Sequence, residues 1–429
     1  MVMRVAPAES KFDVLKTHYG YTSFRPAQET IIDALLSQRD VLGIMPTGAG
    51  KSICYQIPAL MLSGITIVIS PLISLMIDQV AQLKQANLPV AYLNSSLSTA
   101  QSQEALRRAS QGRYKIIYVA PERLTTESFI NFAQEVDISL LAVDEAHCVS
   151  QWGQDFRPAY LRISDFIELL SKRPIVGAFT ATATTAVKRD ITRLLKLNDP
   201  LNLTTGFDRP NLYFEVAKPE DKLSFLYEFI GARKEMCGIV YCSTRKVVES
   251  VCLKIKLSGI SVTRYHAGLD SVERQQNQDD FISGKANIIV ATNAFGMGID
   301  KPNVRYVIHY NMPKNMESYY QEAGRAGRDG NPSECILLFS DDDIKTAEYF
   351  MRGSEKNKDL TEKERQVVSR REIESLEKMV RYCETESCLR TYMLRYFGEK
   401  MKGVCQNCSN CNRPTLWQLL RKKKQRKRF

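Results

Sequence analysis

Short β-branched apolar runs alternate with longer amphipathic stretches over the first 340 residues of the chain. This alternation is typical of parallel α/β domains, in which helices connect strands that are buried on both faces. In the first segment we expect strands at Asp40–Ile44, Ile65–Ser70, Ala91–Leu93, Lys115–Val119, Leu140–Val143 and Ile175–Phe179. In the second segment we expect strands at Leu212–Val216, Gly238–Cys242, Val262–Tyr265, Ile288–Ala291, Tyr306–His309 and Glu334–Phe339.

The periodicity is interrupted near Thr205–Pro210, where Gly206 and Pro210 break both helical and strand patterns. After Ser340 the strand-like runs stop, and a stretch rich in Glu, Lys, Arg, Met and Leu predicts helices. We therefore predict a first lobe, a second lobe, a small helical module and a basic tail, at residues 1–206, 207–340, 341–414 and 415–429.

Composition places the chain among globular proteins, with 44% hydrophobic and 25% charged residues. No apolar run is long enough to span a bilayer, and the first residues lack a secretion signal, so we expect a cytoplasmic or nuclear protein with no membrane partner. The net charge of +11 indicates an acidic partner only weakly, because the run Arg421–Arg428 (RKKKQRKR) holds most of the excess. That tail has two plainer interpretations, a solvated terminus and a nuclear address.

Residues Met45–Ser52 (MPTGAGKS) follow an apolar strand and precede a helical stretch, which is the context of a phosphate-binding P-loop. Glycines there allow the backbone to approach an anion, and Lys51 is placed to reach the outer phosphates. Ser52 offers a hydroxyl to Mg²⁺. The usual first glycine of the motif is replaced by Met45. The loop residues expected to bind nucleotide are Thr47, Gly48, Gly50, Lys51 and Ser52.

A second apolar strand ends in the motif Leu140–His147 (LLAVDEAH), which delivers two adjacent carboxylates to the carboxyl edge of the sheet. Asp144 suits the coordination sphere of Mg²⁺, and Glu145 suits a base that activates the attacking water. Without a cation, two such carboxylates would repel each other. Together with the P-loop, they predict ATP hydrolysis with Mg²⁺.

Four of the eleven cysteines form the pattern C-x16-C-x2-C-x2-C near the C-terminus. Cysteines at this spacing can converge on one tetrahedral Zn²⁺, and four protein ligands leave no open position, so the expected role is structural. Cys383 is a possible substitute for the first ligand, and an iron–sulfur cluster is an alternative occupant. The predicted zinc ligands are Cys388, Cys405, Cys408 and Cys411.

The segment Asp144–Pro158 (DEAHCVSQWGQDFRP) closely resembles the RecQ family of DNA helicases, and further motifs follow in that family's order from about Tyr21 to Cys411. The resemblance implies two tandem RecA-like P-loop lobes with parallel sheets, followed by a small helical zinc-binding module. It also implies ATP-dependent 3′→5′ DNA unwinding in repair or recombination, driven by ATP-dependent lobe closure. Many members continue into a winged-helix domain and a further helical domain, so the chain resembles a short form without them.

The resemblance extends to residues around the nucleotide. Tyr21–Gln28 (YTSFRPAQ) resembles an adenine-reading segment, in which Tyr21 stacks on the base, Arg25 packs on the ring and Gln28 bonds the adenine edge. Gln321–Arg328 (QEAGRAGR) resembles an arginine-finger motif, whose Arg325 and Arg328 would lie near one another in a helix. Further family positions near the nucleotide are His147, Asp300 and Gln321.

A DNA-facing role is implied for the loop Ser150–Pro158, whose aromatic and arginine side chains suit unpaired bases and phosphates. Trp152 could instead fill the core. In the second lobe, YCSTRK and RYHAGL resemble DNA-contacting segments. The expected partner is single-stranded and forked or duplex DNA, and the implied contact residues are Gln151, Trp152, Phe156, Arg157, Thr244, Arg245 and His266.

Two other functions fit the same engine. One is a DNA-stimulated ATPase or translocase without robust duplex unwinding, and the other is an RNA-remodelling helicase. Unwinding assays on DNA and RNA duplexes separate these possibilities.

Overall fold

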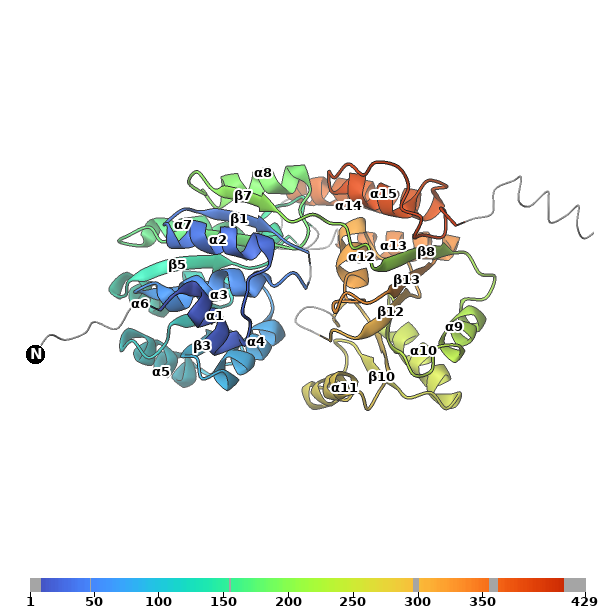
Figure 1. The fold of residues 1–429 in the computed structure, drawn as a ribbon, viewed down its shortest axis with the longest axis horizontal. Coiled ribbons are helices and arrows are strands. Elements are labelled where there is room, and N and C mark those ends of the chain that lie inside the picture. Colours follow the sequence, from blue (N-terminus) through green and yellow to red (C-terminus); the bar gives the residue numbers. More distant parts are fainter. Residues whose placement is uncertain (1–8, 47, 154–155, 296–300, 355–361, 413–429) are drawn as a thin grey trace, which may run out of the picture. The chain divides into compact units, whose positions relative to one another are not determined.

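The computed structural model describes residues 9–46, 48–153, 156–295, 301–354 and 362–412. The chain forms two compact units that meet in sequence between Gly206 and Phe207 (Figure 1). We name the unit before this point the first lobe and the unit after it the second lobe, which includes the C-terminal helices. Thr47, Asp300 and the basic tail lie outside the described residues.

The first lobe is built on a seven-stranded sheet in the order β3-β4-β2-β5-β6-β1-β7, and every strand pair in it is parallel. Its strands are β1 Val41–Ile44, β2 Ile65–Ile69, β3 Val90–Leu93, β4 Ile116–Val119, β5 Ile138–Val143, β6 Ile175–Thr180 and β7 Leu201–Thr204. Its α-helices are α1 Lys11–Tyr19, α2 Pro26–Leu36, α3 Lys51–Met61, α4 Ile73–Gln85, α5 Thr99–Ser110, α6 Glu127–Glu135, α7 Arg162–Leu169 and α8 Thr185–Leu194. The 3-10 helices in the described part of this lobe are η1 Pro121–Thr125, η2 Ala146–Val149 and η3 Pro158–Leu161.

Six of these strands were predicted from the apolar runs, and β7 was not. Its sequence, LNLT, has only two apolar residues, Leu201 and Leu203, and they are only partly buried. They pack against a core in which Ile31 of α2 and Tyr55 of α3 meet Phe179 of β6. A short edge strand buries too little apolar surface to leave a clear period in the sequence.

The second lobe has a six-stranded parallel sheet in the order β10-β11-β9-β12-β13-β8. Its strands are β8 Leu212–Ala217, β9 Cys237–Tyr241, β10 Val262–Tyr265, β11 Ile288–Ala291, β12 Val304–His309 and β13 Ser333–Leu338. Its helices up to residue 340 are α9 Lys222–Gly231, α10 Arg245–Leu257, α11 Ser271–Ser283 and α12 Met316–Ala323. Both lobes confirm the parallel α/β fold expected from the sequence.

The C-terminal helices are α13 Asp341–Ser354, α14 Glu362–Glu384 and α15 Leu389–Tyr396. They pack on the second lobe through aromatic contacts, including a stack of Phe207 on Phe397 with ring centroids 4.5 Å apart. The buried Arg390 of α15 donates hydrogen bonds to the carboxylate of Asp208 and to the carbonyl oxygen of Leu212. No helix in the described part of the chain is long and apolar enough to cross a membrane.

The segment that carries the arginine pair is not helical, so the condition for a helical spacing of Arg325 and Arg328 is not met. Helix α12 ends at Ala323, and the following residues form turns. Gly327 adopts a positive φ of 55°, and a Cβ there would lie 2.5 Å from Asn211 Nδ2. The chain therefore leaves the helix before Arg325, and the relation of the two arginines depends on this glycine turn.

Candidate functional site

The P-loop occupies the turn between β1 and α3. Gly48 and Gly50 adopt φ values of 84° and 81°, which L-residues with a Cβ rarely tolerate. Gly50 caps the amino end of α3, so Lys51 and Ser52 begin the helix. Backbone N–H groups at a helix start carry partial positive charge, which suits phosphate oxygens.

The acidic pair lies at the carboxyl end of β5, close to the P-loop. Lys51 Nζ lies 3.8 Å from Glu145 Oε1. Glu145 holds a left-handed backbone conformation with φ 46°, which costs conformational energy for a residue with a side chain. The buried Tyr160 hydroxyl fixes the same turn by donating to the carbonyl oxygen of Asp144 at 3.0 Å. The fold thus brings together the lysine and the carboxylates that the sequence separates.

Asp144 and Glu145 are both buried. Burial, followed by repulsion from Glu145, raises the pKa of Asp144 to about 6. A buried pair of carboxylates is a donor set that suits a hard divalent cation such as Mg²⁺. Ser52, the other predicted magnesium ligand, accepts a hydrogen bond from Gln79 Nε2 at 3.4 Å. These residues fit a Mg²⁺ ion.

His147 is buried beside the acidic pair. Its Nδ1 lies 2.8 Å from Thr180 Oγ1 and 3.2 Å from Glu145 Oε2. Because the Thr180 hydroxyl donates to the carbonyl of Thr182 at 3.2 Å, it accepts from Nδ1–H of the histidine. The sequence did not identify Thr180 individually, since a strand-end threonine is common. The imidazole thus lies between the carboxylate of Glu145 and the end of β6.

The predicted adenine-reading segment forms hydrogen bonds with the backbone of the P-loop. Gln28 is buried, and its Nε2 donates to the carbonyl oxygens of Gly50 at 3.1 Å and Ala49 at 3.3 Å. Arg25 donates to the carbonyl oxygen of Gly48, and the side chain of Tyr21 is 58% exposed. The amide of Gln28 therefore supports the loop, and an adenine contact requires it to exchange these bonds.

The aromatic loop starts where η2 ends. Trp152 is 47% exposed and Phe156 is half-buried, so both rings have surface to offer a base. Arg157 Nη1 donates to the carbonyl oxygen of Pro71 at 2.7 Å. This bond ties the loop to the segment after β2, an interaction that no local pattern predicts. Gln151 is also half-buried.

In the second lobe, the side chains of Arg209 and Asn211 bond the backbone of the loop that carries the arginine pair. Arg209 donates to the carbonyl oxygens of Gly324, Ala326 and Gly327, and Asn211 Nδ2 also donates to Gly327 at 2.9 Å. Arg325 is only 4% exposed, and among the described residues its Nε and Nη1 have no hydrogen-bond partner. Buried guanidinium donors without acceptors are an arrangement suited to an anionic ligand. Arg328 and Gln321 are half-buried.

The predicted DNA-contact residues of the second lobe have different surroundings. Arg245 is exposed at the first turn of α10, and Thr244 caps that helix by accepting from Val247 N at 3.1 Å. His266 is buried, and its Nε2 lies 2.7 Å from Glu249 Oε1 while Nδ1 accepts from Gly268 N. Both ring nitrogens of His266 are therefore engaged by groups of the second lobe, and a DNA contact by this residue stays a prediction.

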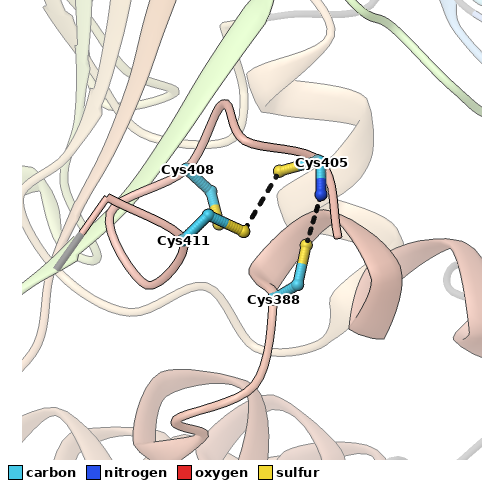
Figure 2. A group of neighbouring side chains, drawn as sticks. All are labelled: Cys388, Cys405, Cys408 and Cys411. Atoms are coloured by element: carbon cyan, nitrogen blue, oxygen red, sulfur yellow. Dashed lines mark hydrogen bonds between the residues drawn. The ribbon is translucent and has the colours of Figure 1, made fainter. Parts of the chain in front are cut away.

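The four predicted zinc ligands converge after α14, with all their sulfur atoms within 4.8 Å of one another (Figure 2). Cys408 Sγ lies 3.4 Å from Cys411 Sγ, and Cys405 Sγ lies 3.8 Å from Cys411 Sγ. Cys383 is buried and is not in this group. The cluster therefore has the sulfur set of a structural zinc site.

Backbone amides point at these sulfur atoms, as in thiolate sites. Thr391 N and Cys405 N donate to Cys388 Sγ at 3.5 and 3.4 Å, and Asn407 N donates to Cys405 Sγ at 3.3 Å. Burial by itself raises the pKa of Cys388, but hydrogen bonds from Thr391 and Cys405 lower it to about 6. The residues present fit a Zn²⁺ ion.

Three family models match successive parts of the chain: DEAD/DEAH box helicase at residues 25–190, helicase conserved C-terminal domain at 221–330, and RecQ zinc-binding at 341–412. The protein is 46% identical to the ATP-dependent DNA helicase RecQ of Bacillus subtilis, over 93% of this chain and 66% of that protein. The chain thus spans about two thirds of this relative's length. A mimivirus relative with an RNA-helicase name is 40% identical over 93% of this chain and 71% of its own length.

Among solved structures, the DEAD-box helicase Mss116 bound to single-stranded RNA matches with a TM-score of 0.67 at 18% identity, covering 92% of this chain and 89% of that one. At this identity the likeness concerns the fold alone. It confirms the expected pair of RecA-like lobes, and the zinc-binding family match confirms the expected module after them.

Proposed function

Because the chain belongs to the RecQ helicase family, we propose that it is an ATP-dependent DNA helicase that moves 3′→5′ and separates DNA strands in repair or recombination. Direction and pathway rest on family membership.

The observation that carries the proposal is the convergence of Lys51 and the Asp144–Glu145 pair at the P-loop, with Lys51 Nζ 3.8 Å from Glu145 Oε1. Lys51 and the loop amides hold the outer phosphates of ATP, and Asp144 and Ser52 hold Mg²⁺. Glu145 orients the attacking water and takes its proton, and the imidazole of His147 lies beside this carboxylate. The chemistry that a bound Mg²⁺ would supply there is neutralisation of the charge that develops on the phosphate oxygens.

Hydrolysis is linked to movement by the second lobe. Arg325 and Arg328 contact the γ-phosphate when ATP draws the lobes together, and loss of that phosphate lets them part. The buried guanidinium of Arg325, with two nitrogens that lack acceptors among the described residues, supports this role. Arginine fingers of this kind accelerate hydrolysis by about 10³ to 10⁵-fold. Asp300 of the second lobe adds to the nucleotide site.

The DNA strand is gripped by both lobes. Trp152 and Phe156 stack on unpaired bases, and Arg245 holds a phosphate. Arg157, which bonds the carbonyl of Pro71, joins the aromatic loop to the segment after β2. Cys388, Cys405, Cys408 and Cys411 hold one structural Zn²⁺.

The experiment is unwinding of a forked DNA by the purified chain with ATP and Mg²⁺, together with ATP hydrolysis measured with and without DNA. We expect strand separation that depends on ATP and on a 3′ single-stranded arm, and hydrolysis stimulated by DNA. Hydrolysis without strand separation would favour the translocase alternative. An RNA fork of the same sequence tests the RNA alternative, and the Lys51→Ala variant controls for contaminating helicases.

A further inference from the structure

An open groove with apolar and cationic lining lies between α8 and the edge strand β7 of the first lobe, with a cavity volume of about 470 Å³. Figure 1 shows α8 and β7 beside each other at the end of this sheet. The strand register pairs Leu42 with Asn202 and Ile44 with Thr204, so these side chains share one face of the sheet. The groove is lined by Leu42, Ile44, Thr185, Lys188, Arg189, Thr192, Arg193, Asn202, Leu203 and Thr204.

The helix turns one polar stripe toward this groove. Thr185, Lys188, Arg189 and Thr192 follow the spacing i, i+3, i+4 and i+7, which places them on one face of α8. The opposite face carries the buried Val187 and Ile191. Because the burying face of α8 is already apolar, the stripe is not needed for packing.

The charges along the groove have one sign. Among the residues that the structure describes, its lining includes Lys188, Arg189 and Arg193 and no carboxylate. Among the described residues no carboxylate pairs with Arg189, which is exposed, while Arg193 pairs with Asp190 at 2.9 Å. Arg193 is thus paired with Asp190 and Lys188 is bonded to Thr204, so Arg189 is the exposed cation that the groove offers to a ligand.

The hydrogen-bonding groups of the groove also suit an acceptor. Lys188 Nζ donates to Thr204 Oγ1 at 3.1 Å, so the hydroxyl proton of Thr204 remains available to an oxygen outside. Asn202 and Thr204 are exposed on β7. Hydroxyl, amide and cationic side chains are the groups with which proteins commonly donate hydrogen bonds to the phosphate oxygens of DNA.

We propose that the groove between α8 and β7 binds the phosphodiester backbone of a DNA strand, as a second contact on the first lobe besides the aromatic loop. The strand's identity as DNA rests on the proposed function. An acidic peptide is the competing occupant, but a peptide added to the free edge of β7 would extend the sheet in its own plane. The cations of α8 instead lie over the face of the sheet, where they can contact a ligand bound in the groove.

The first test compares Arg189→Glu with Arg113→Glu, an equal charge change at another exposed arginine of the same lobe. Binding of a labelled single strand of about 30 nucleotides is measured by fluorescence anisotropy over a range of salt concentrations. We expect Arg189→Glu to weaken binding about tenfold and to reduce the salt slope by about 0.7 for each lost phosphate contact. Arg113→Glu should have a much smaller effect, and equal effects of the two variants would overturn the proposal.

A second test locates the strand directly. Thr185→Cys, labelled with a photoactivatable reagent, should crosslink to the oligonucleotide, whereas Arg113→Cys with the same label should not. Crosslinking at both positions or at neither contradicts the proposal. Labelled polyglutamate identifies the competing occupant, because loss of polyglutamate binding in Arg189→Glu with DNA binding intact would assign the groove to an acidic peptide.

The two proposals fail separately. If DNA stimulates ATP hydrolysis by the unmodified chain but Arg189→Glu behaves as Arg113→Glu, only the groove assignment is wrong. If the unmodified chain binds no DNA, both are wrong. Hydrolysis without DNA and the thermal midpoint should be unchanged in Arg189→Glu, because this exposed side chain touches neither the P-loop nor the core.

Discussion

Ser150 Oγ donates a hydrogen bond of 2.7 Å to Asp190 Oδ2, which fixes the start of the aromatic loop to helix α8. The same hydroxyl accepts from the backbone N–H of Trp152 at 3.0 Å. The carboxylate of Asp190 therefore helps to fix the backbone position of Trp152, although Asp190 lies 40 residues from Ser150 in sequence.

Asp190→Ala should loosen the loop without removing any proposed DNA-contact residue. We expect stimulation of ATP hydrolysis by DNA to fall roughly tenfold or more, as small displacements of positioned groups do, while hydrolysis without DNA is unchanged. Asp190→Asn, whose amide oxygen can still accept from Ser150, should retain most of the stimulation. Equal loss in both variants would show that the carboxylate acts through its charge alone.

Glu145→Gln preserves the shape of the side chain but removes the carboxylate that we propose as the base. ATP hydrolysis should fall about 10² to 10⁴-fold, the usual contribution of a positioned general base. Nucleotide binding, measured with a fluorescent ATP analogue, should persist, because Lys51 and the loop amides are intact. A variant that hydrolyses ATP at the original rate would remove Glu145 from the mechanism.

Trp152→Ala tests base stacking by the aromatic loop. Loss of one stacked ring should weaken binding of a single strand by about 1–3 kcal/mol and reduce the stimulation of hydrolysis by DNA. The matched control is Leu169→Ala on α7, since Leu169 is 49% exposed and Trp152 is 47% exposed. Similar affinities of the two variants for the single strand in an anisotropy titration would indicate that Trp152 has a packing role and does not stack on bases.

Arg390→Ala tests how the zinc module is attached to the second lobe. The buried guanidinium donates to Asp208 Oδ1 and to the carbonyl oxygen of Arg209, both at 2.6 Å. Leaving these acceptors without a donor should lower the free energy of unfolding by about 3 kcal/mol. Arg395→Ala, at an exposed arginine of the same helix, should change it little. Chemical denaturation followed by far-ultraviolet circular dichroism measures the free energy of unfolding of the two variants.

Metal analysis of the purified chain should find one zinc ion. Cys408→Ser should lose the ion and lower the thermal midpoint, because three remaining ligands leave the site incomplete. Cys383→Ser is the control, since this buried thiol is outside the cluster and should leave the zinc content unchanged. Zinc loss in the control but not in Cys408→Ser would reassign the ligand set.

Local patterns in the sequence determined much of this protein. Runs such as Ile65–Ile69 are apolar enough to be buried on both faces, so strand positions and the parallel fold follow from periodicity. The P-loop, the acidic pair and the cysteine spacing are also local, because each places its chemistry within a few residues of chain. Family resemblance added the adenine, arginine and DNA residues.

Only the tertiary structure decided which distant side chains meet. The bond of Arg157 to the carbonyl of Pro71, the clamp of Arg209 on the Gly324–Gly327 turn and the buried place of His266 have no signature near them in sequence. The same is true of β7, whose weak pattern hid a groove facing α8. Hydrophobic periodicity records burial along one element, whereas these contacts depend on how separate elements are placed, which no single stretch of sequence encodes.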